Sequence, residues 1–151
     1  AEFIQAADPR RLPAEVLTVL DEGLKAGKLD PNDVFVTEAR TNATARVKED
    51  QPTLPALEKS AMAANATGVS AAATADALLG YGQPAKAEAL YNLALQRGGV
   101  DVQRVQTRIG IAQFDQGKYA DAKASFDKVT GIRVPLAQLW SIYSAQKAKG
   151  S

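Results

Sequence analysis

The chain of 151 residues contains no cysteine and no histidine. Their absence excludes disulfides, zinc sites built on thiolate or imidazole ligands, protease-type triads and thiol redox pairs. Catalysis by a pair of carboxylates stays open, but the 17 acidic residues lie mainly beside lysine or arginine, which is typical of solvated helix faces. We therefore expect no enzyme activity, no metal and no cofactor.

Neither sign of charge dominates, and no long apolar run is present. The 18 basic and 17 acidic residues leave a formal net charge of +1 and are mixed along the sequence. A surface that follows nucleic-acid phosphates needs clustered basic residues, so we expect no nucleic-acid partner. The apolar runs are far shorter than the roughly 18 residues of a membrane-spanning helix, so we expect no membrane insertion.

One glycine pattern points toward a nucleotide and has to be weighed. Gly80-x-Gly82-x-x-Ala85, followed by Asp101, fits the dinucleotide-binding fingerprint. That fingerprint requires a buried strand before its first glycine, whereas residues 71–77 form an alanine-rich run that favours helix. We interpret Gly82 as a turn residue instead.

Alanine and leucine dominate the hydrophobic residues, which make up 46% of the chain, while aromatic residues make up only 6%. Strands need more β-branched and aromatic side chains than this, so the composition favours helix. Glycine, proline and capping residues divide the sequence into segments of roughly 10 to 18 residues. We predict an all-α protein with about seven to eight helices.

The first half of the chain is predicted to hold three helices. The first spans residues 13–26 and ends at Gly27. The second covers residues 31–48 after a cap at Asp30, and two prolines then break the chain before a third helix over residues 54–66. The buried stripe expected on the second helix consists of Val34, Phe35, Ala39, Ala43 and Val47.

From residue 70 onward, helices and turns recur at a nearly fixed spacing. Shifting the sequence by 35 residues aligns residues of the same size class, as two copies of one helical hairpin would. A further shift of 34 residues carries Ile109 to Tyr143 and Gly110 to Ser144. The predicted helices are 70–81, 84–97, 102–116, 119–129 and one that opens at Pro135, and the first shift pairs Ala75 with Gly110, Gly82 with Gly117, Ala87 with Ala122, and Tyr91 with Phe126.

These residues resemble the tetratricopeptide repeat, a helical hairpin of 34 residues with the pattern W-x2-L-G-x2-Y, then A-x3-F, then P. The second copy fits best, with Ile109-Gly110 at the Leu-Gly position, and Trp140 stands at the tryptophan position of a third copy. The resemblance covers residues 70–149 and implies a right-handed superhelix of antiparallel hairpins, an α-solenoid. The residues expected to pack the repeats together are Ala75, Ala87, Tyr91, Gly110, Tyr119, Ala122, Phe126 and Trp140.

Tetratricopeptide proteins usually bind extended peptides or helices along the concave surface lined by the first helix of each hairpin. The resemblance therefore implies a non-catalytic interaction or scaffold module whose partner is a protein or peptide. By position, the first copy presents Val69, Ala72, Asp76 and Leu79, and the second presents Arg104, Thr107, Arg108, Ile111, Phe114 and Asp115.

Arg104 and Arg108 stand at two positions with which some members of the family hold a terminal carboxylate. The preceding copy departs from that pattern, with Ala72 and Asp76 where lysine and asparagine are usual. The alternative interpretation of the two arginines is an exposed helix face, because they are four residues apart. Phe114 likewise has two interpretations, a partner contact or core packing.

Residues 1–67 show helices without the motif and are expected to add degenerate hairpins to one continuous domain. Residues 68–101 and 102–135 would form the two repeats, followed by a capping helix with a polar outer side. A second functional hypothesis is a structural or self-associating module that forms a homo-oligomer through its N-terminal helices. That contact would use Phe3, Ile4 and Leu12.

The sequence does not determine the compartment, because both the cytoplasm and the periplasm hold cysteine-free domains. The chain begins at Ala1 without a methionine, which favours a processed product or part of a longer protein. The alanine-rich composition agrees with a repeat region of a larger bacterial protein.

Overall fold

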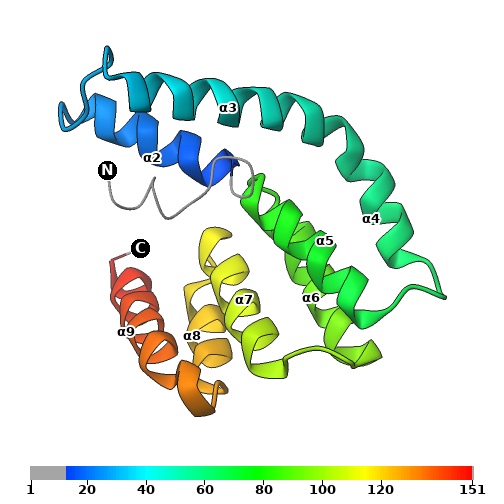
Figure 1. The fold of residues 1–151 in the computed structure, drawn as a ribbon. Helices are drawn as coiled ribbons and strands as arrows, with labels where there is room; N and C mark the ends of the chain where they lie inside the picture. Colours follow the sequence, from blue (N-terminus) through cyan, green and yellow to red (C-terminus); the bar gives the residue numbers. More distant parts are fainter. Residues whose placement is uncertain (1–12, 151) are drawn as a thin grey trace. The chain divides into compact units, whose positions relative to one another are not determined.

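The protein is all-helical, as the composition predicts. A computed structural model describes residues 13–150, and every regular element in that range is a helix (Figure 1). The chain divides into two compact units, residues 1–55 and 56–151. The first holds α2 (Pro13–Lys25), α3 (Val34–Asp50) and the 3-10 turn η1 (Gln51–Thr53); α4 (Leu54–Met62) crosses the boundary; the second holds α5 (Gly68–Gly80), α6 (Pro84–Arg97), α7 (Val102–Asp115), α8 (Tyr119–Asp127), η2 (Gly131–Arg133) and α9 (Val134–Lys149).

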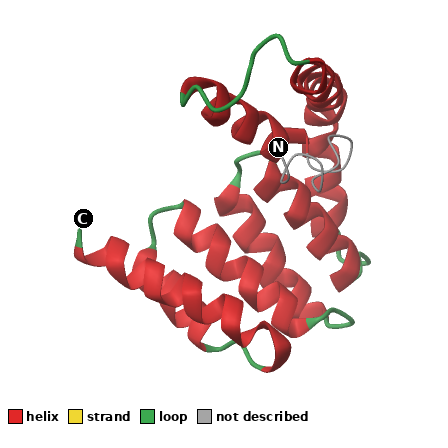
Figure 2. Ribbon diagram, turned by 60° about the vertical axis from the view of Figure 1, so that its left-hand side comes forward, coloured by secondary structure: helices red, strands yellow, loops and turns green. Residues whose placement is uncertain are grey.

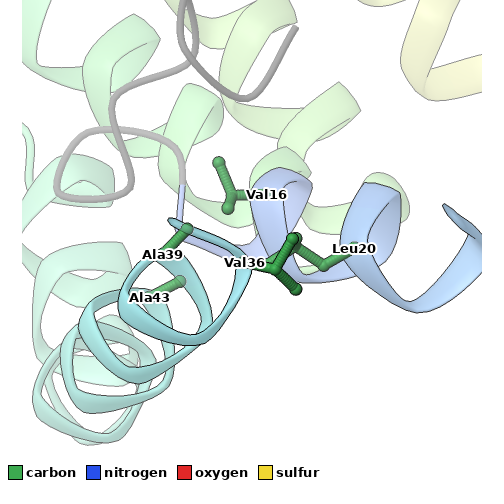
Figure 3. Packing of buried hydrophobic residues seen from close by; sticks show 5 residues of the cluster. All are labelled: Val16, Leu20, Val36, Ala39 and Ala43. Carbon is green, nitrogen blue, oxygen red and sulfur yellow. The ribbon is translucent and has the colours of Figure 1, made fainter. Parts of the chain in front are cut away.

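In the first unit, α2 and α3 pack against each other through a small apolar core. Val16 and Leu20, one turn apart on α2, are fully buried. Val36, Ala39 and Ala43 of α3 face them and are at most 4% exposed. Figure 3 shows Val36 against Leu20, with both alanines on the same side of α3. Burying each of the larger side chains stabilises the pair by about 1.5–3 kcal/mol.

The N-terminus of α3 lies three residues beyond the predicted cap. Asp33 is the N-cap, and its Oδ1 accepts hydrogen bonds from the backbone N–H groups of Phe35 and Val36. Asp30 instead accepts from a backbone N–H two residues further on, in the turn before the helix. The later start leaves Val34 71% exposed. The predicted cap at Asp30 and the predicted burial of Val34 are therefore wrong, as is that of Phe35, which is 38% exposed.

The sequence predicts that Pro52 and Pro55 break the chain, but both prolines lie within helical turns. Pro52 lies in the first turn of η1, and Pro55 is the second residue of α4. Proline is tolerated at such positions because the N–H it lacks would have no partner inside the helix. The result is one 3-10 turn between α3 and α4. The boundary between the two units also falls here, so residues 56–67 belong to the second unit, whereas the sequence predicts a boundary at residue 67 within one continuous domain.

The second unit is a series of helices in which each packs against the next. Helix α5 packs on α6, α6 on α7, α7 on α8, and α8 on α9. The pairs α5/α6 and α7/α8 run antiparallel and form two successive hairpins (Figures 1 and 2). Their ends lie within two residues of the predicted ones, a close match because glycine and proline mark almost every turn.

The two hairpin turns have the same backbone structure. Gly82 and Gly117 adopt φ values of 72° and 75°, a left-handed conformation that costs other residues more. In both turns the residue after the glycine donates its N–H to a carbonyl five residues earlier, which is the Schellman arrangement of a helix end. These bonds join Gln83 N to Leu78 O over 2.8 Å and Lys118 N to Gln113 O over 2.9 Å.

The C-terminal end of α4 is held by side chains of α6. Arg97 donates hydrogen bonds to the carbonyls of Ala61 (2.6 Å) and Ala63 (2.8 Å). Lys86 forms an ion pair of 2.7 Å with Glu58. The last carbonyls of a helix have no partner within it, so Arg97 supplies donors that solvent would otherwise provide.

Helix α9 presents a different face to its neighbours than the 34-residue shift predicts. That shift pairs Ile109 with Tyr143, but Ile109 is 3% exposed and Tyr143 is 44% exposed. The observed burial pattern follows a shift of 32 residues, which also aligns Gly99 and Gly131, both with φ near 70°. The residues of α7 and α9 that this shift pairs as buried are Val105 with Ala137, Ile109 with Ser141, and Ala112 with Ser144.

Candidate partner-binding face

Asp76 of α5 is the centre of a polar cluster that joins three helices. Tyr91 of α6 donates its hydroxyl to Asp76 Oδ1 over 2.5 Å. Arg104 of α7 donates to Asp76 Oδ2 over 2.5 Å, and Arg108 Nε lies 3.7 Å from Oδ1. The structure thus brings together three of the residues predicted to bind a partner and adds Tyr91, which the sequence assigned to packing.

The charges of this cluster are largely matched within the chain. Burial and the hydrogen bond to Asp76 raise the pKa of Tyr91 well above its usual value, so its hydroxyl stays a donor. The hydrogen bond to Asp76 likewise raises the pKa of Arg104. The side chains of Arg104 and Arg108 are each 37% exposed. An incoming carboxylate would therefore reach both arginines but would compete with Asp76 for them.

A groove of about 240 Å³ lies beside the cluster, between α5 and α7. Val69, Ala72, Ala73 and Asp76 line it from α5; Val69 is 59% exposed, but Ala72, which the resemblance would present to a partner, is only 5% exposed. Asp101 and Arg104 line it at the start of α7, and residues 99–100 line it from the loop before that helix. The groove therefore combines the exposed apolar side chain of Val69 with charged groups from both helices.

Asp101 fixes the start of α7 and with it the position of Arg104. Its Oδ1 accepts a hydrogen bond of 2.9 Å from the backbone N–H of Arg104, so Asp101 is the N-cap of the helix. Its other oxygen accepts from Arg133 over 3.3 Å. The backbone hydrogen bond from Arg104, assisted by Arg133, lowers the pKa of Asp101.

The other residues predicted to bind a partner are not gathered on this surface. Thr107 is 4% exposed and donates its hydroxyl to the Gln103 carbonyl within its own helix, so it cannot contact a partner. Ile111 is half-buried and packs on the apolar cluster around Phe126. Asp115 is exposed at the end of α7, and partial desolvation there raises the pKa of its carboxyl.

Phe114 belongs to an aromatic cluster that joins α7, α8 and α9. Its ring centroid lies 5.1 Å from that of Tyr119, 5.2 Å from Trp140 and 4.9 Å from Tyr143. Trp140 in turn stacks on Phe126 at 5.7 Å. Ring pairs at these distances attract beyond their buried area. Of the two interpretations of Phe114, the geometry supports core packing.

The residues predicted to pack the repeats together lie at the contacts between helices. Gly110 shows how tight these contacts are, because a Cβ atom added there would lie 2.6 Å from the ring of Phe126. Ala75, Ala87, Tyr91, Gly110, Ala122 and Phe126 are buried, while Tyr119 and Trp140 are half-buried.

A second polar cluster, centred on Glu88 of α6, was not predicted from the sequence. Glu88 accepts hydrogen bonds from Gln113 (2.9 Å), Gln116 (2.7 Å) and Lys118 (3.0 Å) at the end of the next hairpin's first helix. Burial alone would raise the pKa of Glu88, but these three donors outweigh it and lower the pKa. The 35-residue shift pairs Glu88 with Lys123, so the repeat pattern carries no sign of this role.

Comparison with protein-family models, curated proteins and solved structures found no match to this chain. The tetratricopeptide resemblance therefore stays a prediction, carried by the residues of this chain. Between residues 13 and 150, no three acidic side chains stand close enough together to hold a metal ion. None of the helices described is long and apolar enough to cross a membrane.

Proposed function

We propose that this chain is a non-catalytic interaction module of tetratricopeptide-like hairpins, arranged as a right-handed superhelix. It binds a segment of another protein along the face formed by α5 and α7. The observation that carries the proposal is the groove between these two helices, with Asp76 and Arg104 at its side.

The groove has the mixed character that peptide recognition requires. Val69 and Ala73, which are exposed, can contact apolar side chains of a ligand, and such burial supplies affinity. Arg104 and Arg108 keep about a third of their side-chain surface exposed while Asp76 holds them in place. Charged groups that are fixed before binding lose little conformational entropy when a ligand arrives, and they set its orientation.

Four of the described carboxylates that the sequence left open for catalysis have structural partners. Asp76 and Glu88 accept hydrogen bonds from neighbouring helices, and Asp101 caps α7. Asp127 of α8 accepts from Ser141 of α9 over 2.6 Å. These roles support an interaction module because three of the four, Asp76, Glu88 and Asp127, join one helix to another.

A pull-down with two matched variants tests this proposal. Val69→Arg places a long charged side chain in the groove at an exposed position, and Ile132→Arg makes the same change at a residue that is 95% exposed and does not line the groove. Purified wild-type chain and both variants are incubated with lysate of the source organism. We expect wild type and Ile132→Arg to retain a partner that Val69→Arg loses at least tenfold.

The opposite results are equally informative. Equal retention by both variants would move the binding site away from α5 and α7. Capture of no partner by any form would favour the alternative function, a structural or self-associating module. The residues proposed for self-association, Phe3, Ile4 and Leu12, lie outside the described part of the chain. Circular dichroism spectra of the variants check that both remain folded.

A further inference from the structure

Helix α9 has an apolar stripe on its outer side, where the sequence predicts a polar surface. Leu136 is 48% exposed, Leu139 67%, Ile142 57% and Tyr143 44%. Their spacing of three or four residues puts them on one side of the helix. Apolar groups so arranged make a continuous patch, and such patches on soluble domains usually mark binding sites.

The stripe faces outward because α9 uses its small residues to pack. Ala137, Ser141 and Ser144 are at most 7% exposed and form the inner side of the helix, where Ser141 donates to Asp127 of α8. A larger inward side chain would push α9 away from α8. The large apolar side chains of α9 therefore stay exposed, and no other helix in the described part of the chain covers them.

The charges of α9 indicate what kind of surface covers the stripe. The helix carries Lys147 and Lys149 and no acidic residue, while Arg133, which directly precedes it, is paired with Asp101. Lys147 Nζ lies 5.6 Å from the centre of the Tyr143 ring, so positive charge adjoins the C-terminal end of the stripe. A second copy of α9 would bring the same positive charges to the contact. Complementarity instead requires apolar side chains flanked by acidic ones.

We propose that the stripe of α9 binds an amphipathic, acidic helical segment of a partner protein. Its apolar side chains lie on Leu136, Leu139 and Tyr143, and its carboxylates lie near Lys149. This is helix-on-groove recognition, in which anchors recur at i, i+3, i+4 and i+7. The surface shares no residue with the groove between α5 and α7, so this inference does not depend on that site.

Selection from a peptide display library tests this inference without a known ligand. The library holds random 16-residue peptides; it is selected on the full chain and depleted on the Leu139→Gln variant. Glutamine keeps helix propensity and approximate size but removes the apolar surface. We expect the enriched peptides to carry apolar residues at helical spacing and a net negative charge.

The affinity of an enriched peptide is then measured by fluorescence anisotropy and by the emission of Trp140, the sole tryptophan of the chain. Trp140 contacts Tyr143 and Phe114, so it reports on the stripe. We expect Leu139→Gln to weaken binding at least tenfold and Lys149→Glu to weaken it several-fold. Ile132→Gln, which changes an apolar residue before the helix that is 95% exposed, should leave affinity unchanged.

Three results would overturn the inference. Enriched peptides with net positive charge, or without helical spacing, would refute the partner chemistry. Equal affinity of wild type and Leu139→Gln would refute the site. A dimer of the wild type that Leu139→Gln converts to a monomer in sedimentation would assign the stripe to a second copy of the chain. Leu139 is 67% exposed, so its replacement should leave the fold intact, which melting curves check.

Discussion

The two hairpins of the second unit share their turns but differ in how each is joined to the next helix. Where α5/α6 meets α7, Asp76 accepts from both Tyr91 and Arg104. The 35-residue shift places Ile111 and Phe126 at the positions of Asp76 and Tyr91, and there the contact with α9 is aromatic and aliphatic. One scaffold thus carries a polar junction and an apolar junction at equivalent places.

This difference shows which parts of a helical repeat are free to vary. The glycine turns and the small residues opposite the aromatic rings recur because they fix the distance between the helices. The groups that lie between successive first helices need only match one another. Variation at these positions gives each part of the face its own chemistry, charged beside Arg104 and apolar along α9.

Gly110→Ala should break the apolar junction and have the largest effect. The new methyl group would lie 2.6 Å from the Phe126 ring, which is fixed by stacking on Trp140. Overpacking of this kind costs about 1–3 kcal/mol of unfolding free energy. Urea denaturation followed by circular dichroism measures the loss.

Gly80→Ala is the matched control for that change. A Cβ atom at Gly80 would meet nothing within 4 Å, and its φ is not positive. Replacing this helical glycine should leave stability unchanged or raise it, by up to about 1 kcal/mol. If both variants lost the same stability, the cost would be a property of helical alanine at these sites and not of the contact with Phe126.

Exchanging the aromatic residue types, with Tyr91→Phe at the polar junction and Phe126→Tyr at the apolar one, should have an intermediate effect on stability. Tyr91→Phe removes the hydrogen bond to Asp76, at a cost of about 1 kcal/mol. Phe126→Tyr adds a hydroxyl where Ile111 offers no acceptor, and burying an unpaired hydroxyl costs about 1–3 kcal/mol. Both are measured by urea denaturation. A larger loss for Tyr91→Phe than for Phe126→Tyr would contradict the polar–apolar contrast.

Much of the fold could be predicted from the sequence because local sequence signals determine it. Gly82 and Gly117 mark turns by backbone conformation alone, and the positions of the helices in the second unit follow from them. The cap of α3 was misplaced because Asp30 and Asp33 are both suitable caps. The choice depends on which start buries Val36 against Leu20, and that is a tertiary contact.

The candidate site was predicted only in part, for the same reason. The resemblance to the tetratricopeptide repeat places Asp76, Arg104 and Arg108 on the first helices of two hairpins, so a common face was expected for them. The pairing of both arginines with Asp76 depends on the offset between α5 and α7, which no local pattern encodes. Thr107 illustrates the reverse error, because a polar residue on an expected outer face is buried.

The smallest expected effect concerns acid sensitivity at Glu88, which joins the two hairpins on the α6 side. Its pKa in the folded chain lies below the ordinary value of 4.5, so the unfolded chain binds the proton more tightly. The stabilisation is therefore complete above that ordinary pKa and is lost as pH falls through the folded one. Urea titrations at pH 7 and at pH values below 4.5 should show that Glu88→Gln loses less stability on acidification than wild type does, by a few tenths of a kcal/mol. The same comparison with Glu38→Gln, an exposed residue of α3, should match wild type. Equal acid sensitivity of all three chains would mean that Gln113, Gln116 and Lys118 do not hold the ionised form of Glu88.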